Sequence, residues 1–324
     1  MSLTKVLVIG GAGYIGSHVV KALLAEDCAV TVYDNLSTGQ HCNLFAAAEF
    51  IEGDISDEAK LNTVMAQGFD AVVHLAAKKA VGESMVNPQL YAQNNLNGSI
   101  NIFNAMVNNG VKNVVFSSTA AVYGTPQYLP LDENHPLNPM SFYGYTKAEI
   151  ERVMAWYSQL KDFHFIALRY FNAVGYAADG SIRGKEKNPQ NLLPIVMDVL
   201  AGRREKMQVF GNDYATPDGT CLRDYVHVED LARAHVAAIK KLLQKSKSYI
   251  INLSTAQGTS VLDVIKAAER VSGKKVNYEF APRRAGDPAT VVAGNDLARK
   301  ILGWTPQYTD IDEIVKTTWN LEEK

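Results

Sequence analysis

The chain has 324 residues, of which 47% are hydrophobic and 20% charged, with 32 Lys and Arg against 34 Asp and Glu. This length predicts about two domains of roughly 150 residues each, and the composition is that of a globular protein rather than a disordered one. The net charge of −2 offers no global basic field, which argues against binding to nucleic acid or an anionic membrane.

Sequence features also argue against a secreted, membrane-spanning or zinc-binding protein. No apolar run reaches the roughly 20 residues that a membrane helix requires, and the first residues run into glycine too early for a signal peptide. The three cysteines lack Cys-x-x-Cys spacing, which argues against both a disulfide framework and a zinc site. We therefore expect a cytoplasmic protein that acts on small molecules without a metal ion.

The first 170 residues alternate short apolar runs with helical stretches. Strands are predicted at 5–9, 29–33, 50–52, 71–75, 113–117 and 163–169, and helices at 15–26, 57–67, 90–109 and 143–160. The strand candidates are almost continuously apolar, which is typical of parallel strands covered on both faces. This alternation predicts an α/β fold built on a Rossmann-type, doubly wound parallel sheet.

The pattern changes after Asn172. Residues 176–191 show no periodicity and predict a loop that covers a site. Further helices are expected at 192–201, 228–243, 261–272 and 297–302, and strands at 207–210 and 249–253. We expect a Rossmann domain from residues 1–172 plus about 226–254. A smaller, interleaved α/β substrate domain would take about 173–225 and 255–324.

A glycine-rich turn follows the first predicted strand and opens the first helix. Its glycines, Gly10, Gly13 and Gly16, allow a pyrophosphate to approach the backbone at the helix N-terminus. Asp34 ends the second strand, where a carboxylate accepts hydrogen bonds from ribose hydroxyls and repels a 2′-phosphate, so NAD is favoured over NADP. A turn that only packs a helix on a strand is the alternative, which this strand–turn–helix context disfavours.

The ends of the third and fourth strands fit the same cofactor. Asp54 follows the third strand, and Leu75, Ala76 and Ala77 end the fourth with mostly small side chains. Without the glycine turn, ordinary turn chemistry would explain these residues equally well.

Tyr143 and Lys147 lie four residues apart on a predicted helix and so project from one face. For a tyrosine to act as a base near pH 7, its pKa must fall by about 3 units, which requires ~4 kcal/mol of stabilisation of the phenolate. Lys147 and a nicotinamide cation would together supply that order of energy. Thr119, after the fifth strand, can hold the same substrate oxygen. Alone a Tyr-x-x-x-Lys pair is usually a surface feature, but beside the glycine turn it predicts alcohol oxidation.

These motifs resemble the extended short-chain dehydrogenase/reductase family, and most closely its UDP-galactose (UDP-glucose) 4-epimerases. The resemblance covers nearly the whole chain and includes Gly-Gly-Ala-Gly-Tyr-Ile-Gly-Ser-His at 10–18, Tyr-Gly-Tyr-Thr-Lys at 143–147, Leu-Arg-Tyr-Phe-Asn at 168–172, Arg-Asp-Tyr-Val-His at 223–227 and Phe-Ala-Pro-Arg-Arg-Ala-Gly-Asp at 280–287. It implies a redox-neutral reaction in which hydride leaves sugar C4, a 4-keto sugar turns over, and hydride returns to the opposite face. It also implies a homodimer, formed through the helices near 90–109 and 143–160.

The resemblance further implies a role for each matching residue. Tyr143 would be the base on the sugar 4-hydroxyl, Lys147 its electrostatic partner and Thr119 the helper hydroxyl. The implied NAD-binding residues are Gly10, Gly13, Tyr14, Ile15, Asp34, Asn35, Asp54, Ile55, Leu75, Ala76, Ala77, Lys79, Asn94, Tyr143, Lys147 and Tyr170. The implied UDP-sugar-binding residues are Lys79, Thr119, Tyr143, Phe171, Asn172, Asn191, Leu192, Phe210, Arg223, Tyr225, Arg284, Asp287 and Val291.

Several alternatives stay open on the sequence. Arg223 and Arg284 each have an aspartate nearby and could form structural ion pairs instead. His227 precedes two acidic residues, but without further ligands at suitable spacing a metal site is disfavoured.

Departures from related enzymes bear on the substrate. Ala120 and Ala121 stand where related 4,6-dehydratases carry an acidic pair, which disfavours dehydration. Val291 leaves room in the implied sugar pocket, which predicts that N-acetylated sugars are also accepted. The competing functions are a UDP-N-acetylglucosamine 4-epimerase, a UDP-glucuronate-processing enzyme and, from another class, a non-catalytic NAD-sensing protein. The presence of Tyr143, Lys147 and Thr119 together argues against the last.

Overall fold

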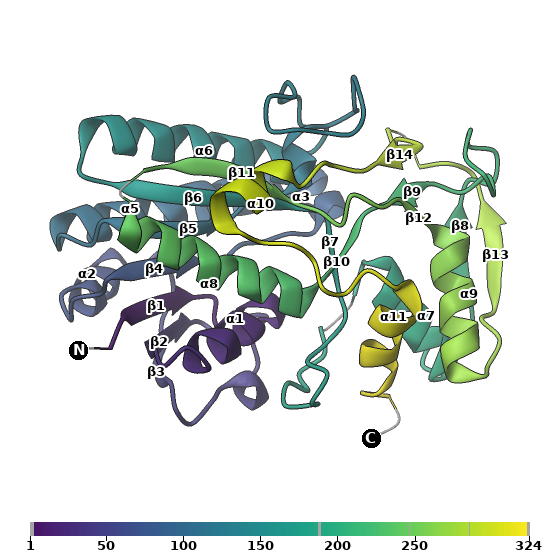
Figure 1. Cartoon of the computed structure of the whole chain (residues 1–324), viewed down its shortest axis with the longest axis horizontal. Helices are drawn as coiled ribbons and strands as arrows, with labels where there is room; N and C mark the ends of the chain where they lie inside the picture. Colours follow the sequence, from purple (N-terminus) through teal and green to yellow (C-terminus); the bar gives the residue numbers. More distant parts are fainter. Residues whose placement is uncertain (1–2, 187–188, 246, 285, 323–324) are drawn as a thin grey trace.

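A seven-stranded parallel sheet forms the centre of the protein (Figure 1). The computed structural model describes residues 3–186, 189–245, 247–284 and 286–322. From one edge to the other the strands are β3 (Glu49–Glu52), β2 (Ala29–Asp34), β1 (Lys5–Ile9), β4 (Ala71–His74), β5 (Asn113–Ser117), β6 (His164–Tyr170) and β11 (Tyr249–Leu253). The order reverses between β1 and β4, and ligands of such sheets bind at this switch point, beyond the carboxyl ends of the strands.

Helices cover both faces of the sheet (Figure 1). On one face lie α1 (Tyr14–Leu24), α8 (Val228–Gln244) and α10 (Asp296–Leu302), and on the other lie α2 (Glu58–Met65), α5 (Gly98–Asn108) and α6 (Phe142–Leu160). Side chains alternate along β1, so that Val6 and Val8 pack on the face covered by α1, α8 and α10, whereas Leu7 and Ile9 pack on the face covered by α2, α5 and α6. All four side chains are fully buried, which explains why this strand reads as continuously apolar.

The segment predicted as one helix over 90–109 is broken in the structure. After α3 (Val81–Val86), the chain forms α4 (Pro88–Tyr91), a π-helical turn (Ala92–Asn97) and then α5. The turn buries Asn95, whose side chain pairs with the backbone N–H and C=O of Lys78 at 2.9 Å each. This wider turn thereby fixes the chain that leaves β4, beside the pocket described below.

The smaller part of the molecule is built from short elements around its own apolar core (Figure 1). Its helices and strands are α7 (Leu192–Leu200), α9 (Val261–Ser272), α11 (Ile311–Trp319), β7 (Asn172–Val174), β8 (Met207–Phe210), β9 (Leu222–Arg223), β10 (Tyr225–His227), β12 (Thr259–Ser260), β13 (Tyr278–Ala281) and β14 (Thr290–Val291). The elements α11 and, apart from β8, all of these strands were not predicted from the sequence. β7, β9, β10, β12 and β14 have only two or three residues, too few for a readable periodicity.

The chain passes between the two parts more than once. β7 follows β6 after one residue and pairs in parallel with β10, which runs directly into α8. Later, α10 and Trp304 return to the core around α8, where the Trp304 indole donates to the Asp230 carbonyl at 2.9 Å. The division into domains stays a prediction, and this packing places 296–304 with the Rossmann part rather than the second.

Within the described ranges, no helix has both the length and the apolar character needed to cross a membrane.

The glycine turn after β1 gives a first test. A Cβ at Gly16 would stand 2.1 Å from the Gly10 carbonyl oxygen, whereas a Cβ at Gly82 would meet nothing within 4 Å. We expect Gly16→Ala to lower the free energy of unfolding by about 1–3 kcal/mol through overpacking. Gly82→Ala, the matched control, should change it by less than about 0.5 kcal/mol. Urea denaturation measures both, and a wild-type midpoint for Gly16→Ala would contradict the close approach.

Candidate active site

A cavity of about 340 Å³ lies beyond the carboxyl ends of the central strands. Most residues predicted to bind the cofactor, and some predicted to bind the substrate, line it. They are Gly10, Gly13, Tyr14, Ile15, Asp34, Asn35, Ile55, Leu75, Ala76, Ala77, Lys79, Asn94, Thr119, Tyr143, Lys147, Tyr170, Phe171, Asn172 and Asn191. Segments that are far apart in the sequence thus meet at one edge of the sheet, as the strand order requires.

One end of the cavity is a cradle of backbone. Gly10 adopts a φ of +86°, and a Cβ there would lie 2.7 Å from the Ala76 nitrogen. Gly13 is the N-cap of α1 and brings no side chain to that helix end. The exposed N–H groups and the dipole of a helix N-terminus favour an anion, so this end suits a pyrophosphate.

Asp34 stands beside this cradle at the end of β2. Its carboxylate accepts hydrogen bonds from the Ala12 N–H at 3.0 Å and the Leu36 N–H at 2.8 Å. Burial raises the pKa of this carboxyl, while both backbone bonds act to lower it. Each carboxylate oxygen has a second acceptor position, so the group is able to receive ribose hydroxyls as well.

Asp54 is not among the residues that line the cavity. Its carboxylate accepts from the Asn35 side chain at 2.6 Å and from the Ser56 N–H at 2.8 Å. Hydrogen bonds, from Ser56 first, hold the pKa of this carboxyl below its usual value despite partial burial. Asp54 therefore fixes Asn35, which does line the cavity. A direct contact between Asp54 and the cofactor stays a prediction.

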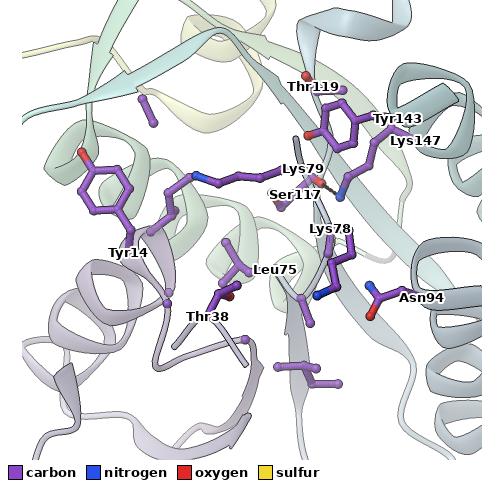
Figure 2. Close-up of a pocket in the computed structure, with 18 of the residues that line it drawn as sticks. Tyr14, Thr38, Leu75, Lys78, Lys79, Asn94, Ser117, Thr119, Tyr143 and Lys147 are labelled. Carbon is purple, nitrogen blue, oxygen red and sulfur yellow. Dashed lines mark hydrogen bonds between the residues drawn. The ribbon is translucent and has the colours of Figure 1, made fainter. Parts of the chain in front are cut away.

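At the other end, Tyr143, Lys147 and Thr119 lie together (Figure 2). Ser141 caps α6 by accepting the Gly144 N–H at 3.1 Å, which fixes where the helix carrying Tyr143 and Lys147 begins. The Lys147 ammonium is almost fully buried and donates to the Ser117 carbonyl at 2.8 Å. Both side chains thus face the end of β5, as their spacing predicts.

Burial sets the charge state of this cluster. It lowers the pKa of Lys147 to about 7, against which the Glu151 carboxylate acts to raise it. It also raises the pKa of Tyr143 to about 12, and a hydrogen bond with the Thr119 side chain acts in the opposite direction. Tyr143 therefore keeps its proton at neutral pH in the protein alone, and additional positive charge in the cavity would favour the phenolate.

Some residues that line the cavity were missed by the sequence analysis. They include Tyr33, Ser37, Thr38, Lys78, Val81, Ser117 and Ala121. Thr38, Lys78 and Ser117 appear in Figure 2 around the cavity between the cradle and Tyr143. Ser37 and Thr38 follow β2, and Lys78 follows β4. Because ligands of such sheets bind beyond the strand ends, the positions of Ser37, Thr38 and Lys78 could have been predicted from the sequence.

The other predicted substrate residues form a second group in the smaller part. Arg223 on β9 makes an ion pair with Asp287, and the Arg284 guanidinium lies 3.9 Å from the centre of the Phe210 ring. Val291 pairs with Arg223 in the strand register. It packs with Phe171, a cavity-lining residue, against one small core, so this group adjoins the cavity.

Two further predicted residues lie near these two groups. Leu192 begins α7 directly after Asn191, which lines the cavity. Tyr225 on β10 pairs with Asn172 on β7, and the Asn172 side chain donates to the Asp224 carbonyl at 3.0 Å. The structure therefore places both parts of the predicted substrate set around the point where the chain crosses between its two parts.

His227 takes a structural position. One ring nitrogen lies 3.0 Å from the Thr317 hydroxyl, the other accepts the Glu229 N–H, and the ring stacks on Tyr308 at 3.8 Å. Among the residues that the structure describes, no three His, Cys, Asp or Glu side chains gather as a metal site.

Known proteins are similar to this chain in sequence and in fold. Residues 6–254 match the NAD dependent epimerase/dehydratase family. The UDP-glucose 4-epimerase of Lacticaseibacillus casei is 46% identical over 98% of this chain and 96% of its own length. A UDP-glucose 4-epimerase from Brucella ovis, solved in complex with NAD, is 42% identical with a TM-score of 0.95 and 97% coverage of both chains. The UDP-Glc/GlcNAc 4-epimerase of Campylobacter jejuni is 38% identical, with a TM-score of 0.87 and 99% coverage of both.

Proposed function

The chain belongs to the NAD dependent epimerase/dehydratase family, and we propose that it interconverts UDP-galactose and UDP-glucose with NAD as cofactor. The full-length relatives confirm the family, the α/β fold class, the epimerase activity and the cofactor predicted from the sequence. The residue roles below are our proposal, and one observation carries them. Tyr143, Thr119 and Lys147 meet in the same cavity as a backbone cradle for a dinucleotide.

The cradle fits NAD in shape and charge. Side chains are missing where a pyrophosphate needs backbone, at Gly10 and Gly13, and Asp34 offers carboxylate oxygens for ribose hydroxyls. When bound, NAD supplies a hydride acceptor and the positive charge of its nicotinamide ring. Asp34 also argues against a 2′-phosphate at this position.

The protein's own groups would handle the proton of the sugar 4-hydroxyl. Tyr143 would accept it as the alcohol is oxidised and return it when the 4-keto sugar is reduced. Thr119 would hold the same oxygen through its hydroxyl, and the Lys147 ammonium would stabilise the tyrosinate. A ketone formed and consumed in one site leaves no net oxidation, so the cofactor has to stay bound.

A strap formed by residues 176–186 supports retention of the cofactor. Asn43 accepts the Gly184 N–H at 2.9 Å and donates to the Ala12 carbonyl of the glycine turn at 3.1 Å. Lys79, which extends across the cavity in Figure 2, makes an ion pair with Glu186 at 2.8 Å. The strap is thus fastened to both sides of the cavity.

The UDP group would bind at the second group of residues. Arg223 and Arg284 are forked donors suited to a diphosphate, and Phe210 offers an aromatic face. Asp287 holds Arg223 in place through their ion pair. These contacts would grip the nucleotide while the sugar occupies the cavity near Tyr143.

The homodimer stays a prediction. On α6, which the sequence analysis named as an interface helix, Trp156 and Leu160 are 61% and 69% exposed. Large apolar side chains with this exposure suit a covered helix face.

The function is tested by assay of purified protein without added cofactor. We expect denaturation to release NAD, and the native protein to convert UDP-glucose into its 4-epimer. NAD release without turnover would support the NAD-sensing alternative instead. Release of no NAD, together with no turnover, would contradict the proposed function.

The base is tested by Tyr143→Phe, which removes only the phenol oxygen. We expect kcat to fall by about 10²–10⁴-fold, as for loss of a general acid–base group, with the NAD content unchanged. Tyr145→Phe is the matched control, because Tyr145 lies on the same helix but is 43% exposed. A wild-type kcat for Tyr143→Phe would show that the base is another group.

The scope for N-acetylated sugars is tested at Val291. Since valine is small and packs against the same core as the cavity-lining Phe171, we expect activity on UDP-N-acetylglucosamine as well as UDP-glucose. Val291→Tyr should lower kcat/KM on the N-acetylated substrate selectively, whereas Val291→Ala should keep both activities. If Val291→Tyr left the ratio of the two kcat/KM values unchanged, Val291 would not determine the selectivity between the two sugars.

A further inference from the structure

A buried ion pair stands directly behind the catalytic cluster. Glu151 lies one helical turn beyond Lys147 on α6, and Arg169 lies on β6; each is 2% exposed. The guanidinium donates through Nε to Oε1 at 2.9 Å and through Nη2 to Oε2 at 2.5 Å. This two-bond geometry fixes the direction of both side chains.

The pair connects α6 to three strands of the sheet. The Ser118 hydroxyl, one residue before Thr119, donates to Glu151 Oε1. Arg169 Nη1 donates to the Tyr123 hydroxyl at 3.0 Å, which donates in turn to Asn252 on β11 at 2.6 Å. The helix that carries Tyr143 and Lys147 is therefore tied to the strand end that carries Thr119.

Stability alone does not account for this pair. Removing two charges from water is costly, and well-packed apolar residues in place of a buried ion pair are often as stable or more so. We propose that Glu151 is a positioning residue that, through Ser118 and Arg169, sets α6 against the end of β5. Its negative charge, one helical turn from Lys147, also acts to favour the ammonium form of that lysine. This inference rests on the proposed roles of Tyr143 and Lys147.

The groups around Lys147 leave Glu151 as the source of this charge effect. Burial lowers the pKa of His74 on β4 to about 3, so His74 is neutral at working pH. Tyr143 and Tyr170, which both line the cavity, keep their protons because burial raises the pKa of both. Arg169 carries a positive charge, and Glu151 compensates it.

The sign of the effect follows from these charges. Burial lowers the pKa of Lys147 to about 7, and the Glu151 carboxylate is the named group that raises it. Without that carboxylate, Lys147 loses its proton at lower pH, and the Arg169 charge adds to the effect. If activity requires the ammonium, the alkaline limb of the kcat profile moves to lower pH.

The test is the pH dependence of kcat in Glu151→Gln, with NAD content and circular dichroism to establish folding. We expect the alkaline limb to move down by about one pH unit, so that kcat on that limb falls about tenfold. Glu149→Gln is the matched control, since this partly exposed carboxylate on the same helix pairs with Arg152. Its profile should match the wild type.

Two further variants separate charge from position. Glu151→Gln combined with Arg169→Gln leaves no unpaired buried charge, and its limb should still move down, though less. Ser118→Ala keeps both charges but removes one tie, so kcat should fall several-fold with the limb unmoved.

Each outcome decides one point. A folded, NAD-containing Glu151→Gln with a wild-type profile would overturn the charge effect, and a wild-type kcat in Ser118→Ala would overturn the positioning. If Tyr143→Phe itself keeps the wild-type kcat, the proposed catalytic roles fail instead, whatever the Glu151 variants show.

Discussion

The site depends on close approach of backbone to backbone where the first strand meets the first helix. Gly16 packs against the Gly10 carbonyl, and Gly10 packs against Ala76 at the end of β4, at separations that leave no space for a Cβ. Two strand ends and a helix N-terminus can therefore share one small volume. The resulting surface is backbone rather than side chain, and such a surface can receive a pyrophosphate without moving.

At the opposite end of the cavity, a charged group is buried with few hydrogen-bond partners. The Lys147 ammonium is buried in the cavity wall, where it donates to the Ser117 carbonyl and lies 4.6 Å from the centre of the Phe116 ring. A buried lysine of this kind is easily deprotonated. Its charge therefore depends on the neighbouring carboxylate and on what occupies the cavity. The same burial that makes Tyr143 a poor base in the protein alone makes it sensitive to added positive charge.

The sequence predicted the Rossmann part well because its strands are long and apolar. β1, β5 and β11 occupy the predicted residues, and α6 begins one residue early. The single helix predicted over 90–109 was wrong, because apolar periodicity does not distinguish an α-helix from a π-helical turn that satisfies Asn95.

Tertiary partners limited the prediction of the site. The pair Arg223–Asp287 joins residues 64 positions apart, so the neighbouring aspartates in the sequence gave no indication of it. Asp54 has the residue type and strand-end position of a cofactor ligand, yet its carboxylate is turned to Asn35 and Ser56. Residue type and spacing place a side chain at an edge of the sheet. The direction in which it points depends on tertiary contacts, which cannot be read from the order of residues along the chain.

The two ends of the substrate set differ in chemistry, and this difference suits a sugar that has to turn over. Forked cations and an aromatic ring gather where the UDP group would bind. Phe171, by contrast, brings apolar surface to the cavity wall, and Val291 packs against the same core; neither side chain can form a hydrogen bond. Because β7 and β10 carry the chain between its two parts as one paired unit, a nucleotide bound at this group of residues would be held in place relative to Tyr143. A tightly held nucleotide beside a weakly held sugar allows either face of the 4-keto sugar to be presented to one hydride donor, which an epimerase requires and a simple dehydrogenase does not.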